Sequence, residues 1–180
     1  MSAEKKTIRD IIIPLTGFPC LKENSTVLEA IQQLRSFCPV GSSDPCGFNE
    51  LMVVNDKGGL VGRITQQGIL RVLFSTLLDP AGIKPFEGRT LEYSDLSTLL
   101  NGVLFKEGVN HLQAGVSSVI EKEIRVLPVS ADLIQAMSVM VMGGETVLPV
   151  EEQGVLCGVV KLAEIFGAIG DTLISMNNKP

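Results

Sequence analysis

The chain has 180 residues, of which 45% are apolar and 19% are charged, so it can bury a sizeable core and is not intrinsically disordered. Its net charge of −5 and isoelectric point near 4.9 argue against sequence-independent nucleic-acid binding, which requires a basic face. No apolar run approaches the roughly 18 residues of a membrane-spanning helix, and residues 1–9 are polar, without a signal-peptide core behind them. We therefore expect a cytoplasmic protein that binds neither nucleic acid nor membrane.

The first predicted elements are a short apolar lead-in over residues 8–12 and a strand over residues 18–21. Apolar residues at helical spacing then predict a helix that follows a capping residue, Ser25 or Thr26. The residues of its apolar face are Val27, Ile31, Leu34 and Phe37.

Next in the chain is a predicted β-hairpin over Leu51–Gly62. The glycines of Asp56–Gly59 supply the positive φ that tight hairpin turns require. Between the helix and this hairpin, Cys38–Gly47 is dense in turn-forming residues and predicts a loop. A second helix after the hairpin is indicated by Ile69, Leu73 and Leu77.

A long connection covers residues 79–115, and Ser94–Phe105 within it predicts a helix. Connections of this length usually carry function or fold into an element of their own, and we expect some of each. His111 lies in a glycine-flanked part of the connection, where we expect it at the surface.

The same order of elements then recurs. Val116–Ile120 resembles the first lead-in, and Arg125–Val129 predicts a strand. A helix follows a capping residue, Ser130 or Asp132. Its apolar stripe consists of Leu133, Met137, Met140 and Val141.

A second hairpin, Val147–Gly158 with its turn at Glu152–Gly154, aligns with Leu51–Gly62. The helix starts align as well, Val27–Ile31 with Leu133–Met137. Such internal repetition indicates a duplicated unit. We predict an α/β (α+β) fold of two βαββα repeats, over residues 7–78 and 116–175, joined by the segment 79–115. The last helix is indicated by Ile165, Ile169 and Leu173.

These repeats resemble a tandem pair of cystathionine-β-synthase (CBS) domains, the arrangement called a Bateman module. The strongest similarity lies in Thr26–Ala30 and in Val54–Thr65, and the order of elements, found twice, adds to it. The resemblance implies two repeats that pack with pseudo-two-fold symmetry and leave two clefts between them.

The resemblance also implies a regulatory role. Many CBS pairs bind AMP, ADP, ATP or S-adenosylmethionine in these clefts, require no cofactor, form homodimers and act on a regulated partner protein through the dimer geometry. Other members serve as ligand-free dimerisation or interaction modules, and this alternative stays open here. The ligand motif of the family is glycine, two apolar residues, threonine or serine, two variable residues and aspartate.

In the first repeat the motif corresponds to Gly62, Arg63, Ile64 and Thr65, with Gly68 where the family has aspartate. The threonine hydroxyl and nearby helix amides suit a phosphate, but Gly68 has no carboxylate for the ribose hydroxyls. Thr65 has an alternative role as a helix cap. Arg63 is expected to be either an exposed strand residue or a second cation near a phosphate.

In the second repeat the motif corresponds to Gly158, Val160, Lys161 and Glu164. Glu164 is one methylene longer than aspartate and still able to bridge a diol, and Lys161 brings a charge that suits a phosphate. The second repeat is therefore the better candidate site. The alternatives are an exposed Lys161 and a Glu164 on a solvated helix face. Cys20 and Leu21, on the first strand, are expected either to wall an adenine pocket or to pack in the core.

The sequence offers no parts for catalysis, which requires a nucleophile with a base, paired carboxylates or a metal cluster. One histidine and four cysteines without Cys-x-x-Cys spacing argue against a structural zinc site. We predict that the protein is not an enzyme. A redox pair of Cys38 and Cys46 is an alternative to ordinary buried thiols; the remaining cysteines are Cys20 and Cys157.

Overall fold

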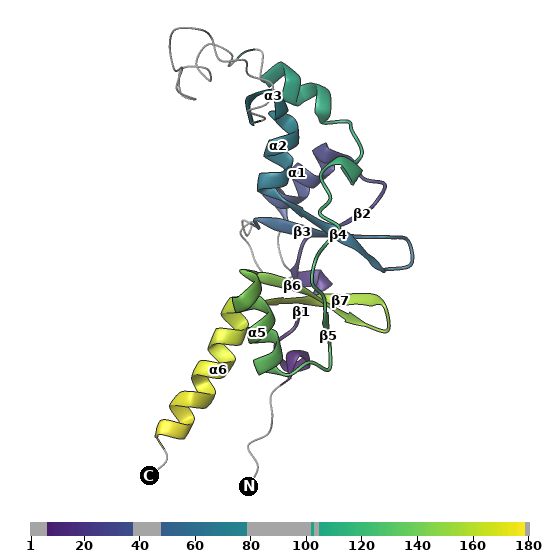
Figure 1. Cartoon of the computed structure of the whole chain (residues 1–180). Helices are drawn as coiled ribbons and strands as arrows, with labels where there is room; N and C mark the ends of the chain where they lie inside the picture. Colours follow the sequence, from purple (N-terminus) through teal and green to yellow (C-terminus); the bar gives the residue numbers. More distant parts are fainter. Residues whose placement is uncertain (1–6, 38–47, 79–101, 103–104, 179–180) are drawn as a thin grey trace, which may run out of the picture.

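The computed structural model describes residues 7–37, 48–78, 102 and 105–178. It consists of two halves stacked one above the other, each with a small sheet flanked by helices (Figure 1). This is the predicted α/β architecture of two βαββα repeats. The predicted loop Cys38–Gly47, with Cys38 and Cys46, lies outside the described residues, as does most of the predicted helix Ser94–Phe105. The described helical residues of the connection are 102 and 105–111, so His111 ends a helix.

The first half contains a three-stranded sheet of order β2-β3-β4. Strand β2 pairs parallel with β3, and β3 pairs antiparallel with β4 through the predicted hairpin. Helices α1 and α2 pack on each other, and α1 also packs on β2 and β3. The bounds are β2 Cys20–Lys22, α1 Val27–Ser36, β3 Glu50–Val54, β4 Leu60–Thr65, α2 Gln66–Leu73 and α3 Ser75–Leu78.

The second half repeats this pattern: β5 pairs parallel with β6, and β6 pairs antiparallel with β7. Helices α5 and α6 pack together below the sheet in Figure 1. The first strand of each repeat, predicted over residues 18–21 and 125–129, is shorter than predicted: three residues in β2 and two in β5. The bounds are β5 Leu127–Pro128, α5 Leu133–Gly143, β6 Val147–Glu152, β7 Val155–Lys161 and α6 Leu162–Asn177.

The helix starts follow from capping chemistry. Thr26, not Ser25, caps α1: its hydroxyl accepts from the Glu29 amide, and the Glu29 carboxylate accepts from the Thr26 amide, a capping box. Asp132, not Ser130, caps α5 by accepting from the Gln135 amide at 2.8 Å. Each cap satisfies an amide that the first turn leaves without a partner.

The lead-in segments are exchanged between the halves. Strand β1, Ile13–Pro14, pairs with β7 of the second half, and Ile8 just before it is fully buried in the second core. Reciprocally, Glu121 forms a bridge with Arg63 on β4, and Val116 is fully buried in the first core. Each repeat therefore completes the sheet of the other. This reciprocity is what an approximate two-fold axis between the halves produces.

Two glycines mark the places where the exchanged segments cross the sheets. A Cβ at Gly62 would collide with the backbone carbonyl of Glu121, and a Cβ at Gly158 would collide with that of Ile13. The glycine that both repeats carry at this position is explained by this close backbone approach.

The cores contain most of the predicted apolar positions, and they meet between the halves, since Val147 and Val159 join the first core. Two predictions were wrong: Val141 and Leu173, expected on the buried stripes of α5 and α6, are exposed. The side chain of Leu77 lies outside the described part. Within the described residues, no helix is both long and apolar enough to span a membrane.

Candidate functional site

Two clefts lie where the halves meet. The first, here called the repeat-2 cleft, has a volume of about 570 Å³, within the range of small-molecule sites. It lies at the junction of β7 and α6 and reaches β3 of the other half. Its walls are mainly apolar, with Asn49, Glu50, Thr146 and Lys161 as polar members; the remaining lining residues are Phe18, Phe48, Val147, Leu162, Ala163 and Phe166.

Aromatic rings and one cation define the chemistry of the repeat-2 cleft. Phe18 and Phe48 meet edge to face with centroids 5.2 Å apart. The Lys161 ammonium lies over both rings, 4.8 Å from the Phe48 centroid and 5.9 Å from that of Phe18, which is cation–π geometry. Phe166 on α6 is 79% exposed. The cleft thus offers flat apolar surface and one positive charge.

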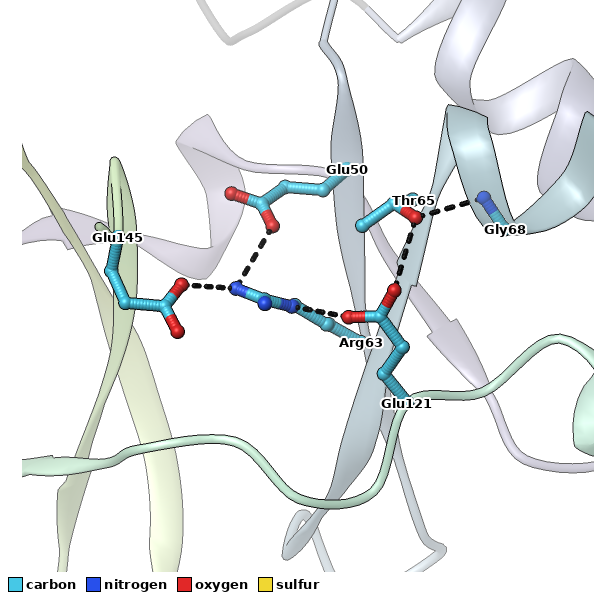
Figure 2. Close-up of polar contacts among 6 residues, drawn as sticks. All are labelled: Glu50, Arg63, Thr65, Gly68, Glu121 and Glu145. Carbon is cyan, nitrogen blue, oxygen red and sulfur yellow. Dashed lines mark hydrogen bonds and ion pairs between the residues drawn. The ribbon is translucent and has the colours of Figure 1, made fainter. Parts of the chain in front are cut away.

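The second, here called the repeat-1 cleft, has a volume of about 380 Å³ and lies beside β4 and the start of α2. It is polar. Figure 2 shows the charged residues at this site, where Arg63 meets three carboxylates. The lining residues are Asn49, Glu50, Arg63, Thr65, Gln66, Gln67, Gly144, Glu145 and Thr146.

Arg63 connects three segments of the chain. Its Nη1 donates to Glu145 of the second half at 2.6 Å and lies 3.6 Å from a Glu50 oxygen on β3. Its Nε donates at 2.9 Å to Glu121, which directly follows the lead-in of the second repeat. Its side chain is 19% exposed, against 12% for Glu50, 18% for Glu145 and 45% for Glu121. The expectation of an exposed strand arginine was therefore wrong.

The pKa values in this cluster follow from burial and from the excess of carboxylates. Burial raises the pKa of Glu50, and this effect exceeds the lowering by the nearby Arg63 charge. Burial by itself would lower the pKa of Arg63, but the hydrogen bonds to Glu145 and Glu121 raise it overall. Glu50 lines both clefts, so its charge acts on both.

The Thr65 hydroxyl has two partners. It accepts from the Gly68 amide at 3.0 Å, which caps α2, and it donates to the Glu121 carboxylate at 3.3 Å (Figure 2). The capping interpretation of Thr65 is thus confirmed. Lys161, its counterpart in the other repeat, gives α6 no side-chain cap.

The two described cysteines are not activated. Burial raises the pKa of the Cys20 thiol to about 11, and burial also raises that of Cys157. Both are therefore neutral thiols at physiological pH, poor nucleophiles and poor metal ligands. Among the described residues, no group of three histidine, cysteine or acidic side chains is arranged to hold a metal ion.

Comparison with known proteins gives the family. Residues 8–75 match the model of the CBS domain. This part of the chain is a CBS domain.

Solved structures extend this assignment to the fold of the whole chain. CBSX2 in complex with AMP is 17% identical, with a TM-score of 0.59 over 92% of this chain and 97% of that one. The CBS domains of a transcriptional regulator from Streptococcus pneumoniae are 14% identical, with a TM-score of 0.56 over 91% and 99%. A hypothetical conserved protein from Geobacillus kaustophilus is 15% identical, with a TM-score of 0.62 over 94% and 99%. No curated protein matches the chain.

The CBS motif positions are divided between the clefts. Arg63 and Thr65 line the repeat-1 cleft, and Lys161 lines the repeat-2 cleft. Glu164 is exposed on α6, beside the lining residue Ala163, and does not itself line either cleft. Six further predicted site residues line neither cleft and lie within the strands instead: Cys20, Leu21, Gly62, Ile64, Gly158 and Val160.

Several residues of this CBS pair were not found from the sequence. Phe18 and Phe48 come from loops before β2 and β3, and Glu121 and Glu145 come from segments far from Arg63 in the chain. One feature of the sequence pointed to Glu121. It directly follows the lead-in Val116–Ile120, and the residue that follows the corresponding lead-in of the first repeat is Ile13, so only the second lead-in is followed by an acid.

Proposed function

We propose that this chain is a non-catalytic regulatory CBS pair that binds an adenosine-containing ligand, such as AMP, ADP, ATP or S-adenosylmethionine, in the repeat-2 cleft. The observation that carries the proposal is the combination found there: phenylalanine rings, the Lys161 ammonium and the start of α6 around one cavity of about 570 Å³. A purine packs on rings, and a phosphate pairs with a cation at a helix N-terminus. The neighbour that binds AMP has the same fold.

The ligand would span both halves. Phe18 and Phe48 come from the first repeat, whereas Lys161, Leu162 and Phe166 come from the second. A ligand seated among them contributes binding energy that depends on the angle between the halves, so it selects one geometry. Glu164, one residue from the lining Ala163, is our candidate for the ribose hydroxyls, which it reaches by turning its exposed side chain into the cleft.

Signalling would pass through a homodimer. Apolar side chains are exposed together on α5 and α6, among them Met142, which is 87% exposed. Such a face is typical of a protein interface. The other exposed apolar residues of these helices are Ile134, Val141, Phe166, Leu173, Ile174 and Met176. Light scattering should give the mass of two chains, and Val141→Glu with Leu173→Glu should give that of one; Val155→Glu at a hairpin end is the control.

The test of ligand binding is thermal unfolding with each of the four compounds. At about 100 times Kd a ligand adds roughly 2.7 kcal/mol, a rise of about 5–10 °C for a chain of this length. Lys161→Met should weaken AMP by about 10- to 150-fold while sparing adenosine, because only AMP carries the phosphate. Lys122→Met is the control for charge. No rise with any compound at millimolar concentration rejects the proposal.

The alternative is a ligand-free dimerisation or interaction module. It is favoured by one observation: in both clefts the cation is already engaged, Arg63 by carboxylates and Lys161 by ring faces. In that case the dimer forms fully without any added compound, and none of the four compounds changes the unfolding temperature.

A further inference from the structure

We propose that Glu121 acts as an internal substitute for a ligand phosphate and closes the repeat-1 cleft to anionic nucleotides. The inference deepens the proposed function, since it takes the ligand class from there and assigns binding to one cleft of the two. The evidence for it is the set of contacts that the Glu121 carboxylate makes.

The Glu121 carboxylate occupies the groups that would hold an anion. One oxygen accepts from Arg63 Nε at 2.9 Å and the other accepts from the Thr65 hydroxyl at 3.3 Å. A guanidinium and a hydroxyl at the start of a helix are phosphate-binding groups. In this structure the oxyanion that bridges them belongs to the protein itself (Figure 2).

The backbone holds this carboxylate in place. The Arg63 amide donates to the Glu121 carbonyl at 3.0 Å, and the Glu121 amide donates to the Arg63 carbonyl at 2.8 Å. Residue 121 is thus fixed on β4 directly beside residue 63. An incoming phosphate must therefore displace a carboxylate that is already held at the site. The phosphate loses translational freedom when it binds, whereas the tethered carboxylate does not.

The other carboxylates reinforce the closure. Glu145 accepts from Arg63 at 2.6 Å, and a Glu50 oxygen lies 3.6 Å from the same nitrogen. One guanidinium therefore faces three acids, and the field in the repeat-1 cleft opposes an anion. The repeat-2 cleft has no counterpart: the residue that pairs with β7 where Glu121 pairs with β4 is Ile13.

The experiment follows backbone amide signals by NMR during titration with AMP. In the wild-type chain the signals of Gln66 and Gly68 should stay unchanged at millimolar AMP. In Glu121→Ala they should shift and saturate, an affinity gain on the order of tenfold or more, the value of hydrogen bonds to a charged group. Glu121→Ala combined with Glu145→Gln should bind AMP more tightly still.

Matched variants define the cause. Glu123→Gln changes the net charge two residues away and should behave as wild type. Thr65→Val added to Glu121→Ala should reduce the gained binding, and adenosine, which lacks the phosphate, should not bind at the opened cleft. If Glu121→Ala fails to fold, Glu121→Gln removes the charge and preserves the shape.

The outcome separates this inference from the proposed function. The amides of Leu162 and Ala163 report on the repeat-2 cleft in the same titrations. If they never shift while the Gly68 signal shifts in Glu121→Ala, the proposed function fails and the inference holds. Wild-type binding at Gly68 equal to that of the variants overturns the inference, and so do folded Glu121 and Glu145 variants whose Gly68 signal does not respond.

Discussion

Arg63 and Glu121 are joined through both backbone and side chains: their main-chain amides and carbonyls pair in both directions, and the Arg63 Nε donates to the Glu121 carboxylate at 2.9 Å. The pair connects the lead-in of the second repeat to the sheet of the first. The backbone pairing also holds the negative charge of Glu121 next to the Arg63 guanidinium, at the repeat-1 cleft.

Gly158→Ala should destabilise the protein by several kcal/mol. The added methyl group collides with the Ile13 carbonyl, so β1 must separate from β7. Gly167→Ala on α6 is the matched control: nothing lies within 4 Å of its Cβ position, and the change should stabilise the helix by about 0.5–1 kcal/mol. Urea unfolding measures both, and equal effects at the two positions would contradict the crossing.

Ile8→Ala should weaken the second half, although Ile8 belongs to the first repeat in sequence. The side chain is fully buried in the second core, and such truncations cost about 2–5 kcal/mol. Hydrogen exchange should therefore accelerate at Leu148 and Val150 on β6. Arg9→Ala removes only an exposed ion pair with Glu152 and should cost less than about 1 kcal/mol.

Glu50→Gln should raise the unfolding temperature at neutral pH. Since the pKa of Glu50 is raised in the folded protein above its ordinary 4.5, protonation favours the folded state. The associated stability is fully present below pH 4.5 and is lost as the pH rises through the folded pKa. The neutral glutamine avoids that loss. Thermal scans from pH 4 to 8 should show the two proteins diverging as the pH rises; a constant difference would refute the assignment.

Thr26→Ala should destabilise the protein by about 1 kcal/mol, because it removes the cap of α1 and its reciprocal bonds with Glu29. For a chain of this length that corresponds to a fall in unfolding temperature of about 2–4 °C. Ser25→Ala, one residue earlier, should change it by less than half as much. Calorimetry distinguishes the two, and a larger effect at Ser25 would reverse the cap assignment.

The sequence predicts the parts of this fold that depend on neighbouring residues. The hairpin turns follow from local chemistry, because Gly58 and Gly154 adopt positive φ. The order of helices and strands also follows from local patterns, and its occurrence in both repeats strengthened the prediction. Of the sites, the sequence indicated Lys161 and Arg63 as cations. It did not indicate their partners, because Glu145 lies 82 residues from Arg63 and reaches it only through the packing of the halves. The sequence also did not predict that Val141 and Leu173 are exposed. The apolar stripes of α5 and α6 extend beyond the parts of these helices that pack against the rest of the chain.

The exchanged lead-ins have a consequence for how this protein is made and broken down. A fragment ending at Leu78 would carry β1 without β7 and would lack the Glu121 segment that borders β4, so it would present unpaired sheet edges and invite aggregation. The fragment beginning at Val116 would lack Ile8, with a gap in its interior. Loss of the segment from Ile8 to Pro14 should therefore destabilise the second half first, because the core and the sheet of that half both include residues from this segment.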